Sequence, residues 1–457
     1  MTTLRLAIVG AGPAGIYAAD ILLRTERNFD VSIDLFEKLP APYGLVRYGV
    51  APDHPRIKGV VNALRDVLDR GDIRIFGNVT FGEDITLDDL KKHYNAVIFS
   101  TGAIRDAALD IPGIEAKGSF GAADFVSWYD GHPDVPRTWH LTGQHVGMIG
   151  NGNVALDAAR VLAKHADDLL PTEIPQNVYD VLKASPVTDV HVFGRRGPAQ
   201  VKFTPLELRE LGEMNDVDMV VYDEDFDYDD ASREAIATNK QVKVIDRVLQ
   251  KWRDLPSANG AGGEASRRLH LHFWAKPLEV KTDSEGNVTA LVYERTRSDG
   301  AGGVVGTGEV REQTLSQLYR AVGYFGSALP GLPFDENHGV IPNHEGQVLA
   351  DDSNDILPGV YATGWIKRGP VGLIGHTKSD AMETVTHLVN DQSSWWQPED
   401  PSSEAIPALL ESRGVAWTDL DGWHRLDEHE VALGEPHGRA RIKVVPRDEM
   451  LRISRGE

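Results

Sequence analysis

A glycine motif near the N-terminus limits the possible folds of this chain more than any other stretch. The apolar run from Leu4 to Val9 enters the turn from Gly10 to Gly15, and a helix-forming segment begins at Ile16. In such a strand–turn–helix unit, Gly10 permits the tight turn, Gly12 lets a pyrophosphate approach the backbone, and Gly15 lets the helix pack closely. The amides that begin the helix then point toward the phosphates. These features predict a dinucleotide site.

An acidic residue follows the next predicted strand. This strand runs from Val31 to Phe36, and Glu37 comes directly after it. An acid at this place accepts a hydrogen bond from a ribose hydroxyl of a dinucleotide. The glycine spacing alone is weak, but the strand, helix, second strand and acid occur in the required order. We therefore expect the N-terminal unit to bind a dinucleotide.

The same pattern recurs in the middle of the chain, with a different ending. A predicted strand from His145 to Ile149 enters the turn from Gly150 to Ala155, and a later strand from Val187 to Phe193 leads into Arg195 and Arg196. An acid suits a free ribose 2′-hydroxyl, whereas an arginine pair suits a 2′-phosphate. The alternative is a solvated surface pair of arginines. We predict FAD in the first unit and NADPH in the second.

Composition narrows the function classes. A chain of 457 residues is too long for one core and suggests two or three domains. The two strand–turn–helix units predict the α/β class. The absence of cysteine excludes disulfides, iron–sulfur clusters held by this chain, thiolate zinc and redox dithiols. A formal net charge of −22 argues against nucleic-acid binding. Electrons handled by this chain must therefore pass through a bound organic cofactor to an outside acceptor.

Several absences are also expected. No apolar run approaches the roughly 20 residues that a membrane span needs. Because the first strand begins at Leu4, we expect no uncleaved targeting segment and a cytoplasmic location. His270 and His272 share one face of an alternating strand, and we expect them to face solvent rather than a metal. No metal site is predicted.

Four stretches together resemble adrenodoxin reductase and the bacterial NADPH–ferredoxin reductases. They are residues 43–55, 152–157, 194–198 and 364–370, and the segment 410–415 also fits. The resemblance implies a three-layer, glutathione-reductase-like flavoprotein with two Rossmann-like dinucleotide-binding domains, the NADP domain being inserted in the FAD domain. The implied limits are 1–104 and 331–457 for the FAD domain and 105–330 for the NADP domain.

The resemblance also implies roles for individual residues. For FAD it assigns Gly10, Gly12, Ala14, Gly15, Glu37, Leu45, a strand that contains Val79 and Phe81, Trp365, Gly372, Leu373 and Ile374. For NADP it assigns Asn151, Gly152, Asn153, Val154, Arg195, Arg196, Glu207 and again Gly372. His54 and Glu210 are candidate catalytic groups near the flavin, acting on protons or hydrogen bonds. The alternative for His54 is a structural role in its loop.

The implied activity is electron transfer from NADPH, through a hydride to FAD, to a one-electron iron–sulfur acceptor such as ferredoxin. The enzyme would be a ferredoxin–NADP(+) reductase and a monomer. A small acidic partner would need a local positive surface on this acidic chain. The available basic residues are Lys202, Arg209, Lys367, Arg368, Arg439, Arg441 and Lys443.

Other functions are weighed against this one. A different NADPH-dependent flavin oxidoreductase, such as a monooxygenase, would show NADPH consumption stimulated by an organic substrate. Thiol reductases are excluded by the lack of cysteine. A glutamate-synthase-like electron-distributing subunit would work only inside a larger complex. A nucleotide-sensing binding module fits poorly with two complete dinucleotide units.

Overall fold

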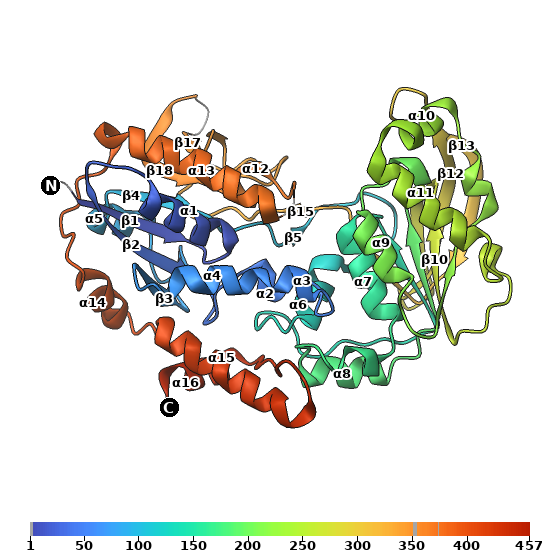
Figure 1. Cartoon of the computed structure of the whole chain (residues 1–457), viewed down its shortest axis with the longest axis horizontal. Helices are drawn as coiled ribbons and strands as arrows, with labels where there is room; N and C mark the ends of the chain where they lie inside the picture. The colour runs from blue at the N-terminus through green and yellow to red at the C-terminus, as the bar shows by residue number, and fades with distance from the viewer. Residues whose placement is uncertain (1–2, 351–353, 373) are drawn as a thin grey trace. The chain divides into compact units, whose positions relative to one another are not determined.

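The computed structural model describes residues 3–350, 354–372 and 374–457. It divides into two compact units, shown in Figure 1. Unit 1 comprises residues 1–105, 130–134 and 323–457, and unit 2 comprises residues 106–129 and 135–322. The domain limits expected after residues 104 and 330 stay predictions, because a compact unit need not coincide with a domain. Among the described helices, none has the length and apolar character that crossing a membrane requires.

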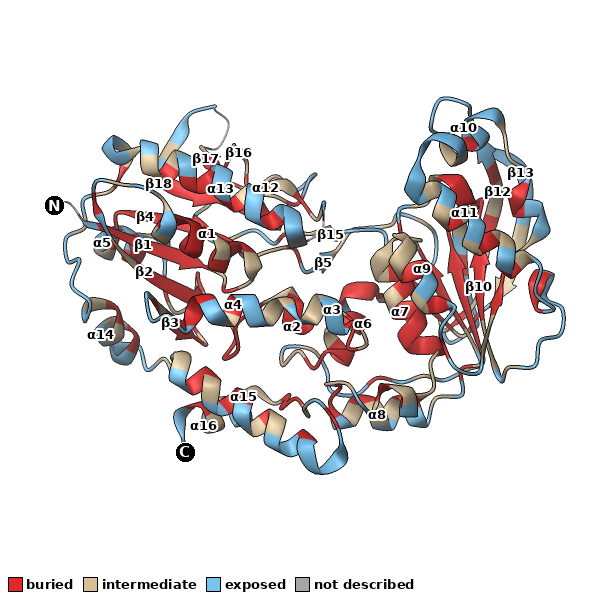
Figure 2. Cartoon of the chain, in the orientation of Figure 1, coloured by how far each residue is buried: buried red, intermediate tan, exposed pale blue. Residues whose placement is uncertain are grey.

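Unit 1 is built on a seven-stranded sheet in the order β16-β17-β18-β4-β1-β2-β3. Strand β1 pairs in parallel with both β2 and β4, which puts the carboxyl ends of these strands at one edge. The bounds are β1 (Thr3–Val9), β2 (Asp30–Glu37), β3 (Ile73–Gly77), β4 (Ala96–Phe99), β16 (Asn343–His344), β17 (Gln347–Leu349) and β18 (Ile356–Ala362). Figure 2 shows β1, β2 and β4 buried.

Helices cover both faces of this sheet. Apolar residues of α1 (Pro13–Arg24), α4 (Val60–Leu68) and α13 (Ile374–Asn390) form a core with one face. Residues of α5 (Leu87–His93) and α14 (Ala405–Ser412) form a core with the other face. The remaining helices are α2 (Leu45–Tyr48), α3 (Pro55–Lys58), α12 (Trp365–Arg368), α15 (Leu420–Gly434) and α16 (Arg447–Arg455). Unit 1 is therefore a three-layer α/β structure.

Unit 2 is built on a parallel sheet in the order β6-β14-β7-β8-β10-β9. The bounds are β6 (Ser119–Gly121), β7 (His145–Ile149), β8 (Asp189–Phe193), β9 (Val217–Val220), β10 (Arg267–His272) and β14 (Gln317–Arg320). An antiparallel sheet of β11 (Ala275–Thr282), β12 (Val288–Ser298) and β13 (Val304–Thr314) accompanies it. Outside these sheets, the short strands β5 (Arg105–Asp106) and β15 (Tyr324–Phe325) pair with each other, and β15 belongs to unit 1.

The two faces of the unit 2 sheet are covered differently. Helices α6 (Ala122–Tyr129), α7 (Asn153–Ala163), α8 (Gln176–Lys183), α9 (Pro205–Leu211) and α11 (Lys240–Arg253) contribute to one core, and α10 (Asp230–Thr238) lies beside α11. On the other face, Ile149 and Phe193 pack with residues of β11 and β12, including Leu291 and Tyr293. The α/β class with two Rossmann-like sheets, predicted from the sequence, is confirmed.

One local prediction was wrong. The strand β3 ends at Gly77, so Val79 and Phe81 lie in the turn after it, where the Val79 amide donates to the Glu37 carbonyl at 2.9 Å. Helices α10 and α11 occupy much of the acidic segment 223–264.

Candidate functional site

The first glycine turn leaves a backbone face open between β1 and α1. Gly10 has a φ of +108°, and a Cβ there would lie 2.6 Å from the Ser100 carbonyl oxygen, so both conformation and space require glycine. Gly15 has the same spatial need, since its Cβ would lie 2.2 Å from the Gly10 carbonyl oxygen. At Gly12 a Cβ would have no described atom closer than 3.9 Å. The turn is therefore tight on its protein side and open on the other.

Glu37 connects the end of β2 to this turn. Its Oε2 accepts from the Ala11 amide at 2.8 Å, and its Oε1 accepts from the Leu39 amide at 3.1 Å. Burial raises the pKa of the Glu37 carboxyl, and the two amide hydrogen bonds oppose that rise. The carboxylate thus fixes the shape of the glycine turn, a role that the ribose-binding motif did not predict.

The loop that carries Leu45 lies against the same turn. The Tyr43 amide donates to the Ala11 carbonyl at 2.8 Å, and Gly44 approaches Gly12. Leu45 opens α2 and is half-buried, whereas Val79 and Phe81 are buried. The structure therefore gathers the loop of Leu45 and the turn of Gly10 to Gly15 in one region of unit 1.

The second glycine turn, between β7 and α7, repeats this geometry in unit 2. Gly150 has a φ of +117°, and a Cβ there would lie 2.2 Å from the Ala321 carbonyl oxygen. A Cβ at Gly152 would meet no described atom within 4 Å, and no side chain caps the start of α7. The Nδ2 of Asn151 is buried and has no hydrogen-bond partner among the described residues. An open turn, a helix N-terminus and an orphaned donor fit a phosphate-bearing ligand.

Arg195 and Arg196 follow β8 on a loop that is fixed by its backbone. The Arg195 carbonyl accepts from Thr296 Oγ1 at 2.7 Å, and the Arg196 carbonyl accepts from the Trp274 amide at 3.2 Å. Arg195 is exposed and Arg196 is partly exposed. No carboxylate in the described ranges forms an ion pair with either guanidinium. A positioned but unneutralised pair of this kind can accept an anion from solution.

Asp380, which the sequence did not single out, organises the turn that carries Trp365. Its Oδ2 accepts from the Gly364 amide at 2.5 Å and from Thr363 Oγ1 at 3.1 Å. Its Oδ1 lies 3.1 Å from Lys367 Nζ, which also pairs with Glu383 Oε2 at 2.5 Å. Trp365 is half-buried, and its ring centroid lies 6.5 Å from that of Tyr324.

Of the other residues assigned near this turn, Gly372 is exposed and Ile374 begins α13. Leu373 lies outside the described residues. Ala14 is buried in the first turn of α1. In the second turn, Asn153 Oδ1 accepts from the Thr204 amide at 3.0 Å, which ties the start of α7 to the loop before α9.

The two candidate catalytic residues belong to different units. His54 is 2% exposed and precedes α3 in unit 1. Glu207 and Glu210 both lie on α9 in unit 2; Glu207 is buried, and Glu210 Oε2 lies 3.8 Å from an Arg160 guanidinium nitrogen. Arg160 is itself buried and bonds Asp157 at 2.8 Å. Glu210 thus belongs to a charged group at the α7–α9 contact.

The basic tail is not the exposed patch that the sequence suggested. Lys443 is 3% exposed, and its Nζ donates to the Arg47 carbonyl at 2.7 Å and the Asp130 carbonyl at 3.0 Å. Arg439 is also buried, and Arg441 pairs with Asp427 at 2.5 Å. Lys367 is buried by its contacts with α13. Of the seven predicted docking residues, Lys202 and Arg209 are exposed, and the others are buried or partly buried.

The expectation that His270 and His272 face solvent was wrong. They are 5% and 7% exposed, and the ring of His272 stacks on Phe193 and Tyr222. Sequence alternation shows that both histidines share a face, but not that another layer covers this face. A third histidine, His191 on β8, lies beside them, with one ring nitrogen from each of the three within 4.8 Å of the others.

The buried histidines predict a loss of stability on acidification. Burial and neighbouring imidazoles lower the pKa of His191 and His272 well below the usual value. Below the ordinary histidine pKa of about 6.5, the unfolded chain binds protons that these folded imidazoles do not bind. The free energy of unfolding should therefore fall by up to about 1.4 kcal/mol per pH unit for each histidine. Urea unfolding from pH 7.5 to 5.5, compared between the natural chain and a His191→Gln, His272→Gln variant, checks this; equal slopes would contradict it.

Two α/β sheets, one mixed and one parallel, that each carry an open glycine turn define a pyridine-nucleotide oxidoreductase of two-dinucleotide type. The family described as "Pyridine nucleotide-disulphide oxidoreductase" matches residues 4–193. The chain is 38% identical to NADPH-ferredoxin reductase FprA of Mycobacterium tuberculosis, over 99% of both chains. It is 37% identical to the mitochondrial NADPH:adrenodoxin oxidoreductase of Bos taurus, over 99% of this chain and 92% of that one.

A solved structure agrees with these similarities. The structure of Mycobacterium tuberculosis FprA in complex with NADPH has a TM-score of 0.91 and 38% identity, and covers 99% of this chain and 100% of that chain. The chain belongs to the family of the NADPH-ferredoxin reductases and NADPH:adrenodoxin oxidoreductases. The family resemblance expected from the sequence motifs is confirmed.

Proposed function

We propose that this chain is an FAD-dependent ferredoxin–NADP(+) reductase, which passes electrons between NADPH and a one-electron iron–sulfur protein. The observation that supports this most directly is the pair of open glycine turns in two separate sheets, of which only the second is followed by an unneutralised arginine pair. Family membership supports the same activity. Since the chain contains no cysteine, it provides no thiol or cluster to hold the electrons.

The residues of unit 1 fit FAD, and those of unit 2 fit NADPH. The open face at Gly12 and the Glu37 carboxylate would take the pyrophosphate and ribose of FAD, with Leu45 and Trp365 beside the cofactor. The open face at Gly152 and the Asn151 amide would take the NADPH pyrophosphate. When bound, the flavin supplies the change from two-electron hydride chemistry to one-electron transfer.

His54 and Glu210 are proposed to act on protons or hydrogen bonds at the flavin. His54 lies in the loop that also carries Leu45, within the region of unit 1 assigned to FAD. Glu210 Oε2 lies 3.8 Å from an Arg160 guanidinium nitrogen, and a carboxylate at this place can accept a hydrogen bond. We also propose a cytoplasmic location and a monomeric state.

An anaerobic titration tests the proposed activity. The FAD-loaded chain should be bleached by stoichiometric NADPH and far less readily by NADH, and an added oxidised ferredoxin should restore the flavin absorbance. Gel filtration of the same sample should give the molecular mass of a monomer. Activity that appears only in a larger complex would favour the electron-distributing subunit, and NADPH consumption driven by an organic substrate would favour a monooxygenase.

A methyl group at Gly152 should weaken NADPH binding without unfolding the chain. Gly152 has a φ of −90°, which alanine adopts, and its Cβ would meet no described atom within 4 Å. We expect Gly152→Ala to raise the KM for NADPH at least about tenfold while the free energy of unfolding changes by about 1 kcal/mol or less. Gly150→Ala is the comparison, since its positive φ and its 2.2 Å approach to Ala321 predict a loss of stability. An unchanged KM for NADPH in Gly152→Ala would show that the turn from Gly150 to Ala155 does not bind this cofactor.

Ferredoxin reduction should weaken as salt is added. The chain is strongly acidic, so an acidic partner needs a local positive surface, and Lys202 and Arg209 are its exposed candidates in unit 2. The KM for ferredoxin should rise between about 20 and 300 mM salt, with a smaller rise in a Lys202→Ala, Arg209→Ala variant. An unchanged KM over this range would contradict electrostatic docking.

A further inference from the structure

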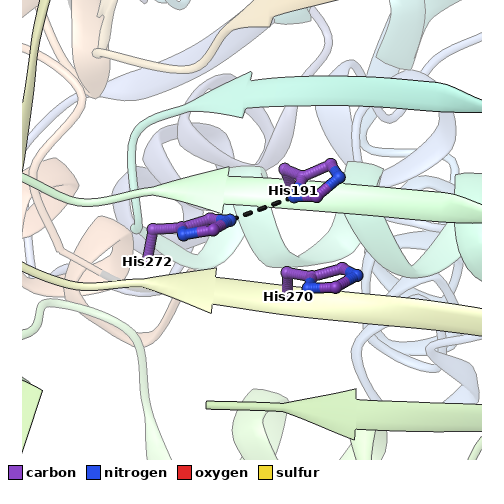
Figure 3. Close-up of side chains that lie close together, drawn as sticks. All are labelled: His191, His270 and His272. Carbon is purple, nitrogen blue, oxygen red and sulfur yellow. Dashed lines mark hydrogen bonds between the residues drawn. The ribbon is translucent and has the colours of Figure 1, made fainter. Parts of the chain in front are cut away.

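Four histidines cross three adjacent strands on one face of the unit 2 sheet. His145 lies on β7, His191 on β8, and His270 and His272 on β10. The parallel register pairs His191 directly with His270, so their rings stack at a centroid distance of 4.3 Å. Figure 3 shows the ring of His272 beside these two, with a hydrogen bond to His191. The strand register alone therefore brings three imidazoles together.

Both ring nitrogens of His191 and of His270 make hydrogen-bond contacts. His145 Nδ1 lies 3.2 Å from His191 Nε2, and Asp189 Oδ1 lies 3.0 Å from His270 Nε2. The other nitrogen of His270, Nδ1, contacts the Tyr222 hydroxyl at 2.9 Å, so a metal ion bound there would replace that hydrogen bond. His191 Nδ1 lies 3.0 Å from His272 Nε2. In metal-binding histidines, a carboxylate or another acceptor commonly holds the nitrogen that does not bind the metal. Asp189 holds Nε2 of His270 in this way.

The cluster lies in the interior of unit 2, next to one buried carboxylate. His191, His270 and His272 are at most 7% exposed. Asp189 supplies a buried negative charge and also bonds Arg268 at 2.7 Å.

The cluster is also enclosed on its remaining sides. The Tyr222 hydroxyl lies 2.9 Å from His270 Nδ1, and the Tyr293 ring lies 6.2 Å from that of His272. The nearest further cations are Arg295 and Arg311, of which Arg295 pairs with Asp225 and Arg311 with Glu224. These carboxylates offset part of the positive charge of the two arginines, which otherwise disfavours a cation at His272.

We propose that His191, His270 and His272 bind one divalent transition-metal ion of the zinc class. Nitrogens bound to one tetrahedral zinc at about 2.0–2.1 Å are roughly 3.3–3.4 Å apart, and the three ring nitrogens already lie within 4.8 Å of one another. Because the three rings lie nearly parallel, they must rotate about their side-chain torsions to direct these nitrogens at one ion, and a water molecule can complete the coordination. Imidazole donors select zinc, copper or nickel over magnesium and calcium. The site lies in the sheet of unit 2 and does not depend on the proposed reductase activity.

Metal titration of the untagged, FAD-loaded chain tests this proposal. After chelator treatment and its removal, we expect one Zn²⁺ per chain in competition with a chromophoric chelator, and visible d–d absorption of tetrahedral type with one Co²⁺ per chain. Zn²⁺ should also raise the unfolding temperature. These measurements on the natural chain need no variant to fold. Absence of stoichiometric binding would show that the histidines form only a hydrogen-bonded core, and would overturn the proposal without affecting the reductase assay.

Variants then identify the ligands. Asp189→Asn should lower the Zn²⁺ affinity about 10- to 100-fold, as expected for an outer contact, and His191→Gln or His272→Gln should lower it further. His338→Gln is the matched control, because His338 is exposed in unit 1, pairs with Asp335, and belongs to no such cluster. Retention of full affinity in both His191→Gln and His272→Gln would overturn the assignment.

Discussion

Replacing Arg195 and Arg196 together with alanine is expected to remove most of the preference for NADPH over NADH. Both guanidinium groups follow β8 on a loop held by Thr296 and Trp274, without an internal carboxylate partner in the described chain. A charge-assisted hydrogen bond contributes about 1.5–3 kcal/mol, so each arginine should account for about a tenfold to hundredfold change in the KM for NADPH. Steady-state kinetics with an artificial acceptor measure this.

The change should be specific to the 2′-phosphate. The KM for NADH should stay within about threefold, because the phosphate that the arginines contact is missing from that cofactor. Arg247→Ala is a matched control, since Arg247 is an exposed arginine on α11 of the same unit. Equal use of NADPH and NADH by the natural chain would refute the assignment of Arg195 and Arg196.

Replacing Glu430 with glutamine is expected to destabilise unit 1 strongly. Glu430 on α15 is fully buried. Its Oε1 and Oε2 accept hydrogen bonds from the Arg47 guanidinium at 2.6 and 3.0 Å. It also accepts from the Val444 amide at 3.0 Å. Removing one charge of a buried pair costs about 3–5 kcal/mol, because the other charge stays buried without a counter-charge. Urea unfolding measured by tryptophan fluorescence gives the change.

Glu428→Gln serves as the control for this prediction. Glu428 lies on the same helix but is exposed, so its replacement should change the free energy of unfolding by less than about 0.5 kcal/mol. Similar small effects of both substitutions would mean that the Arg47–Glu430 pair contributes little. A selective loss of FAD from Glu430→Gln is also expected, because Arg47 lies in α2 next to Leu45.

The sequence predicted the parts of this structure that depend on local chemistry. The strand–turn–helix units at Gly10 and Gly150 could be located because glycine is required there by positive φ and close backbone approach. The second strands could be located because Glu37 and Arg195 follow short apolar runs. Such signals lie within a few dozen residues, so they need no knowledge of the tertiary structure.

The parts that were missed depend on contacts between distant segments. Asp380 reaches back to the Gly364 turn, and nothing in its own neighbourhood marks it. In the sequence Lys443 resembles a surface cation. In the structure it is buried because its ammonium group donates to the carbonyls of Arg47 and Asp130, which are distant in sequence. The histidines of β10 become buried only because a second sheet and Tyr222 cover them.

The division of the chain into units has a consequence for synthesis at the ribosome. Unit 1 is assembled from three separate segments, the last of which contains β16, β17, β18 and the tail with Glu430 and Lys443. Unit 2 is complete once residue 322 has emerged, while the N-terminal strands still lack these neighbours. Domains generally fold as units during synthesis. Unit 1 is therefore begun first and completed last. Its N-terminal strands stay exposed until the C-terminal segment has been synthesised.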